Sequence, residues 1–177
     1  MTDSSNSRSY GAPFDVKPHA YDPAVDPELF EGVLARRLIA FLIDVVILAG
    51  PILLLAVFIF VAGIVTLGFG FLLYGLLGPL SAIWAVAYYG FCFGGPYSAT
   101  VGMRLMDLEM RTWYGAPAYF VLGAVHAVIY WITVSSLTPL ILFVAFFNHR
   151  KRLLHDMLCG TVVINNATRA AALRRNI

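Results

Sequence analysis

Asp44 is an acid near the start of a long apolar run, and it is the residue with the clearest potential for chemistry. From Val45 to Met103 the sequence contains no Asp, Glu, Lys, Arg or His. If this run spans a bilayer, a carboxylate at the bilayer centre costs about 2.5–3.5 kcal/mol on insertion scales. Two interpretations stay open: a buried acid that holds helices together by hydrogen bonds, and a carboxylate that handles a proton or cation.

Arg37 and Asp156 are the charged residues that could act with Asp44. Arg37 and Asp44 are seven residues apart, so on a helix they share a face but are separated by about 10.5 Å along the axis. They are therefore not a direct pair. Asp156 is either a helix-end residue paired with Arg152, four positions earlier, or a partner that meets Arg37 from the same side of the membrane. Arg37, Asp44 and Asp156 thus form a candidate ion or proton site, or a structural charge network.

The remaining titratable residues give weaker signals. His126 stands alone in a third apolar block, where an interhelical hydrogen bond is favoured over a proton relay. His155 and Asp156 are adjacent and do not face each other on a helix, and no other ligand has metal-site spacing. We expect no metal site and no cofactor. The sequence contains no nucleophile–base pair, nucleotide loop or HExxH motif, so we expect no enzyme.

Composition indicates a membrane protein. The chain has 177 residues, of which 60% are hydrophobic and 12% charged, against about 25% charged in average soluble domains. The net charge of +2 is too small to indicate a nucleic-acid partner. The expected surroundings are a lipid bilayer, together with either a second copy of the chain or another membrane protein.

Hydropathy and turn residues divide the chain into a disordered N-terminal tail, a transmembrane domain and a basic C-terminal tail. We expect the tails over 1–30 and 166–177 and the domain over 33–165. Within the domain, we expect helices over about 38–63, 71–93 and 118–147. Short strands are expected over 105–111 and 160–165. The first two helices form a hairpin. The fold class is an all-α polytopic membrane protein, a small helical bundle with a short cytoplasmic β-ribbon.

The positive-inside rule places the three basic clusters in the cytoplasm. They are Arg36/Arg37, Arg104/Arg111 and Arg150-Lys-Arg152. An even number of crossings satisfies all three clusters and allows the two strands to pair on one side. The third apolar block is then a helical hairpin with its break at 135–139, and one long helix bent at Pro139 is the alternative. The N-terminus is expected in the cytoplasm.

Three motifs give the chain a family resemblance. They are Arg37-Leu-Ile-Ala-Phe-Leu-Ile-Asp44, Thr100-Val-Gly-Met-Arg104 and Arg152-Leu-Leu-His-Asp-Met-Leu-Cys-Gly-Thr-Val-Val163. In order and spacing they resemble the RDD family, which is named for one arginine and two aspartates. The motifs add secondary site residues, namely Thr100, Gly102, Arg104, His155 and Thr161. The chain departs from the family pattern at Met103, where the family usually has lysine.

The resemblance implies an integral, multi-pass protein of the cell membrane, the inner membrane in a bacterium. The family has been suspected of transport, and some members resemble sodium–proton antiporters. Carried over by residue, this implicates Arg37, Asp44 and Asp156 in cation or proton handling. The alternative is a non-catalytic accessory or assembly subunit of a membrane complex, in which these charges are structural.

Overall fold

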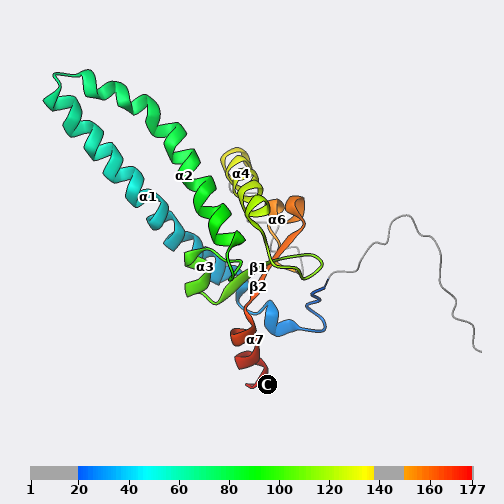
Figure 1. Cartoon of the computed structure of the whole chain (residues 1–177). Coiled ribbons are helices and arrows are strands. Elements are labelled where there is room, and N and C mark those ends of the chain that lie inside the picture. The colour runs from blue at the N-terminus through cyan, green and yellow to red at the C-terminus, as the bar shows by residue number, and fades with distance from the viewer. Residues whose placement is uncertain (1–19, 138–149, 177) are drawn as a thin grey trace, which may run out of the picture.

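A computed structural model describes residues 20–137 and 150–176 of the chain (Figure 1). Two predictions fall partly outside these ranges. The choice between a hairpin and a bent helix over 118–147 depends on residues that the structure does not describe. The N-terminal tail is described only from Ala20 onward.

The first two apolar segments form a long helical hairpin, as the sequence predicts (Figure 1). Helix α1 covers Val33–Val65, the 3-10 turn η2 covers Phe69–Leu73, and α2 covers Tyr74–Gly94. Both helices are long and apolar enough to cross a membrane. The turn packs closely against α1 at Gly70. A Cβ atom there would lie 2.5 Å from the carbonyl carbon of Ala62, so only glycine fits at this position.

Helix α4 (Phe120–Leu137) packs against α2 through glycines on both helices. A Cβ at Gly123 of α4 would lie 2.9 Å from the carbonyl oxygen of Tyr89 and 2.7 Å from the Cβ of Phe93. A Cβ at Gly90 of α2 would lie 2.7 Å from the ring of Phe120. Small residues permit this close approach, which is a common device between membrane helices.

The two predicted strands pair as an antiparallel ribbon, which confirms that part of the fold class. Strand β1 (Leu108–Thr112) pairs with β2 (Thr161–Asn165), with Met110 opposite Val163. A short helix precedes each strand of the ribbon. Helix α3 (Val101–Leu105) comes before β1, and α6 (Leu154–Cys159) comes before β2. In β1 the buried side chains of Leu108 and Met110 alternate with half-buried ones, whereas all five residues of β2 are buried.

Residues from the expected N-terminal tail pack on β2. The 3-10 turn η1 (Pro27–Leu29) leads into Phe30, which packs on Val162 and Ile164. The side chain of Asn165 donates to the carbonyl oxygens of Glu28 and Glu31, at 2.8 and 2.9 Å.

Helix α7 (Ala167–Arg174) lies within the segment expected to be a C-terminal tail. The side chain of Asn166 caps its first turn by accepting a hydrogen bond from the backbone N–H of Arg169. At its other end the Nε of Arg174 donates to the carboxylate of Glu28 at 2.8 Å. Both ends of the described chain are therefore attached to the ribbon.

The glycine at the α2–α4 crossing generates a stability prediction. We expect Gly123→Ala to destabilise the protein by about 1–3 kcal/mol, because the added methyl group overpacks a closed contact. Gly78→Ala in α2 is the matched control, since nothing lies within 4 Å of the position where its Cβ would stand. Thermal unfolding in mild detergent measures both variants. Equal melting temperatures for the two variants would contradict the close packing.

Candidate functional site

Both carboxylate oxygens of Asp44 accept hydrogen bonds. The side chain is buried, with 4% of its surface exposed. Oδ1 accepts from the Tyr88 hydroxyl at 2.6 Å and from the backbone N–H of Gly102 at 2.8 Å. Oδ2 accepts from the Thr100 hydroxyl at 2.6 Å. The acid of α1 is therefore bound to α2 and to the start of α3.

The Thr-x-Gly sequence supplies two of these donors because of local geometry. Thr100 is the N-cap of α3, and its hydroxyl accepts from the backbone N–H of Met103 at 3.1 Å while donating to Asp44. Gly102 lies directly against α1, since a Cβ there would be 2.1 Å from the carbonyl oxygen of Ala40. Any larger residue would push α3 away from the carboxylate.

Tyr88 is the partner of Asp44 that sequence reasoning missed. The sequence suggests an aromatic belt at the level of the lipid headgroups, formed by Tyr88, Tyr89 and Tyr97. In the structure, however, Tyr88 and Tyr89 are each only 8% exposed. Tyr97, at 62% exposed, fits the belt interpretation. The sequence did contain one indication of this contact. Tyr88 places a hydroxyl group in an apolar helix, and the same chain has to bury the acid Asp44.

Arg37 pairs with Asp156, the contact that the second interpretation of Asp156 predicts. Arg37 Nη2 lies 2.5 Å from Asp156 Oδ2, and Arg37 Nη1 donates to the carbonyl oxygen of Lys151 at 3.2 Å. The backbone N–H of Leu153 donates to the same carboxylate oxygen at 3.0 Å. Asp156 is fully buried. Burial alone would raise its pKa, but Arg37 above all holds the pKa below its usual value.

Arg152 contacts the backbone around Asp156, not its carboxylate. Its Nη2 donates to the carbonyl oxygen of Asp156 at 3.1 Å, and its Nε donates to that of Thr161 at 2.9 Å. The guanidinium also lies 4.5 Å from the ring centroid of Trp113. Burial lowers the pKa of Arg152. This arginine therefore stabilises the link between α6 and β2.

Two histidines complete the surroundings of Asp156. Nε2 of His126, from α4, lies 3.6 Å from Asp156 Oδ1, and Nε2 of His155 lies 3.5 Å from the same atom. Neither distance is a good hydrogen bond. The expected interhelical hydrogen bond of His126 is thus not observed within the described residues. Burial lowers the pKa of His155 to about 3, against the opposing effect of Asp156.

The three predicted site residues therefore divide into two groups. Asp44 binds neutral donors from α2 and α3, whereas Arg37 binds Asp156 and the backbone near α6. Among the secondary residues, Thr161 contacts the Asp156 carbonyl oxygen at 3.4 Å. Arg104 Nε donates to the carbonyl oxygen of Ala99 at 3.1 Å and does not join either group.

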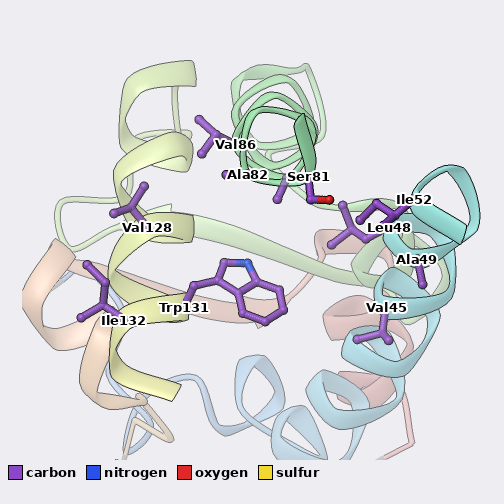
Figure 2. A pocket seen from close by; sticks show the side chains of 11 residues that line it. Val45, Leu48, Ala49, Ile52, Ser81, Ala82, Val86, Val128, Trp131 and Ile132 are labelled. Carbon is purple, nitrogen blue, oxygen red and sulfur yellow. The ribbon is translucent and has the colours of Figure 1, made fainter. Parts of the chain in front are cut away.

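An apolar pocket of about 490 Å³ lies between α1, α2 and α4 (Figure 2). Figure 2 shows that aliphatic side chains and the Trp131 indole form most of its lining, and Ser81 supplies the hydroxyl. Asp44 does not line it, although its neighbour Val45 does. Among the described residues this pocket offers no charged group to an ion.

Comparison with known proteins gives one result. The family model described as the RDD family matches residues 32–160. No curated protein and no solved structure matches the chain. The matched range includes Asp44, its three donors and the Arg37–Asp156 pair.

Removal of the charge on Arg37 should be strongly destabilising. Arg37→Gln leaves a buried carboxylate without its counter-charge, which costs about 3–5 kcal/mol. Arg36→Gln is the control, because Arg36 pairs with half-exposed Asp107 at 3.6 Å, a pair that contributes about 1 kcal/mol or less, and its hydrogen bond to the Met106 carbonyl oxygen leaves no buried charge unpaired when it is lost. Chemical or thermal unfolding in detergent measures both. The double variant Arg37→Gln/Asp156→Asn should regain part of the loss, and a strictly additive loss would contradict a direct pair.

Proposed function

The chain belongs to the RDD family, and from that membership we propose that it is a polytopic membrane protein that acts as a non-catalytic accessory or assembly subunit of a membrane complex. In this proposal Arg37, Asp44 and Asp156 have structural roles. They attach the cytoplasmic ribbon and its short helices to the membrane helices. The family match and the two long apolar helices support an integral membrane protein.

The observation that carries the structural role is that both oxygens of Asp44 accept hydrogen bonds from other elements. Its two oxygens receive three short hydrogen bonds, at 2.6, 2.6 and 2.8 Å, from three different residues. Three of the roughly four lone-pair sites of this carboxylate are therefore in use. Coordination of an ion by both oxygens would require the loss of Tyr88, Thr100 or Gly102 as a donor. That loss would leave buried polar groups unsatisfied, at about 1–3 kcal/mol for each group.

The shape of the hairpin supports a role in assembly. The α1–α2 hairpin extends well beyond the rest of the described chain (Figure 1). Large apolar side chains on its outer half are exposed, for example Leu54 at 73%, Phe58 at 65% and Leu72 at 78%. In a bilayer such faces meet lipid or the helices of neighbouring proteins. A two-helix arm with these side chains exposed among the described residues is suited to contact with a partner helix.

The distribution of basic residues supports a cytoplasmic location for the ribbon. Arg36 and Arg37 at the start of α1 contact Asp107 and Asp156, so both are at the ribbon end. Arg111 is part of β1 itself. The turn between α1 and α2 lies at the opposite end of the hairpin and has no charged residue (Figure 1). The positive-inside rule then places both described ends of the chain in the cytoplasm.

Cation handling is the second candidate function, and one observation favours it. Asp156 Oδ1 is buried and has no hydrogen-bond partner among the described residues, although two imidazoles face it. If this protein handles a cation, Asp156 is therefore a better candidate than Asp44.

The structural role predicts the effect of Asp44→Asn. An amide keeps the shape but replaces one acceptor oxygen by a donor, so charge-assisted hydrogen bonds of about 1.5–3 kcal/mol each are weakened or lost. We expect lower steady-state abundance and a lower melting temperature. Asp107→Asn, at a half-exposed acid, is the control and should behave as wild type. A mild-detergent pull-down of the wild-type protein should recover one defined partner in repeated experiments.

Two results would contradict this proposal. One is normal abundance of the Asp44→Asn variant together with repeated recovery of the chain alone. The other is a cation flux in proteoliposomes that Asp44→Asn abolishes while the abundance and melting temperature stay normal. The second result would favour the transporter in place of the accessory subunit.

The proposed orientation predicts a labelling pattern. Free thiols are present at Cys92 and Cys159, so the test begins from a Cys92→Ala/Cys159→Ala background. Leu67→Cys, in the hairpin turn at 94% exposure, should react with a membrane-impermeant maleimide in intact cells. Asn176→Cys should react only after the membrane is permeabilised. The reverse pattern would contradict the orientation.

A further inference from the structure

Three ligand-type side chains converge where α4 and α6 meet Arg37. His126, His155 and Asp156 have 7%, 2% and 0% of their surfaces exposed. Within the described part of the chain, Asp156 Oδ1 and the Nδ1 atoms of both histidines have no hydrogen-bond partner. Buried polar atoms are normally satisfied, and an ion held by the Nε2 atoms would account for the unsatisfied Asp156 Oδ1, although not for the two Nδ1 atoms.

Two of the three separations between ligand atoms are close to those of a small metal site. Nε2 of each histidine lies 3.5–3.6 Å from Asp156 Oδ1. A tetrahedral ion with bonds of about 2.0–2.1 Å holds its ligand atoms about 3.3–3.4 Å apart. One ligand atom from each of the three residues lies within 4.8 Å of the others. The two imidazole planes are inclined by 75° to each other.

We propose that His126, His155 and Asp156 bind a first-row divalent transition-metal ion, for which Zn²⁺ is the representative. Two imidazole nitrogens and one carboxylate oxygen are a donor set that suits zinc, cobalt or ferrous ions. Magnesium and calcium require more oxygen ligands than this cluster offers. The proposal concerns Asp156 and not Asp44, and it is independent of the accessory role proposed above.

Sequence spacing did not predict this site. His155 and Asp156 are neighbours, and His126 is on a helix that precedes β2 and α6 by a long stretch of chain. The packing of α6 against α4 places the two imidazoles edge to face, with ring centroids 4.8 Å apart. The metal site that we did not expect from spacing thus arises from a tertiary contact.

Arg37 affects the metal affinity and the ion selectivity that we expect of this site. Its guanidinium already occupies Asp156 Oδ2, so an ion would use Oδ1 and would share the carboxylate with a cation. The Nδ1 atoms also lack acceptors among the described residues, and loss of such outer contacts typically weakens metal affinity by about 10- to 100-fold. We therefore expect a site weaker than a closed structural zinc site and selective for ions that favour nitrogen.

The test measures metal retention by the purified full chain. The protein is prepared in mild detergent with a tag that contains no histidine, stripped with EDTA and then dialysed against Zn²⁺ or Co²⁺. Wild type should retain about one ion per chain and show the visible absorption of Co²⁺ with low coordination number. Zn²⁺, but not Mg²⁺, should raise its melting temperature. No retained ion and no shift in melting temperature would overturn the proposal on the wild-type protein alone.

Two variants locate the ion. His126→Asn and His155→Asn should each reduce retention at least tenfold, with unchanged elution and melting behaviour in EDTA as the check on folding. The control is His19→Asn/His149→Asn, which replaces the two histidines outside the described residues and should retain the ion. Loss of the ion in the control, or full retention in both site variants, would overturn the assignment. A failed partner pull-down would not affect any of these results.

Discussion

The fold depends on how a carboxylate is accommodated inside an apolar bundle. Asp44 is stable there because Tyr88, Thr100 and Gly102 direct three donors at its oxygens. Two of these donors belong to the start of α3, which leads directly into β1. The acid therefore fixes the position of the ribbon relative to α1, in addition to pairing α1 with α2. The hydrogen bond from the backbone N–H of Gly102 to Asp44 holds the first turn of α3 against α1.

The spacing of Arg37 and Asp44 acquires a meaning from this arrangement. The two residues lie on one face of α1, two turns apart. Asp44 holds the segment that enters β1, and Arg37 holds the segment that enters β2 through Asp156. Since β1 and β2 also pair with each other, α1 and the two strands are linked at three places. One helix face thereby positions both strands, although the strands are far apart in sequence.

The sequence was sufficient for the helical hairpin, for the two-stranded ribbon and for one of the two polar groups. Hydropathy located the helical hairpin, period-two alternation located β1, and the positive-inside argument placed Arg37 near Asp156. Tyr88, His126 and α7 were not identified in these roles, because their positions depend on tertiary contacts. The sequence around a tyrosine at a helix end looks the same whether its side chain lies among lipid headgroups or in the protein core. Local propensity also gave no reason to expect that residues 20–30 would pack on β2, or that α7 would pack on η1.

The two acids differ in the kind of partner that each has, and this difference limits the chemistry of each. Asp44 is bound by hydroxyls and a backbone amide, with both oxygens in use, and the adjacent pocket is apolar (Figure 2). Asp156 has a guanidinium on one oxygen and two imidazoles near the other. Arg37 neutralises the carboxylate, so any further cation must be held mainly by the imidazole nitrogens. That requirement favours metals with high affinity for nitrogen. Under the two proposals, ion binding belongs to the ribbon end of the bundle, and the acid inside the helical hairpin has the structural role.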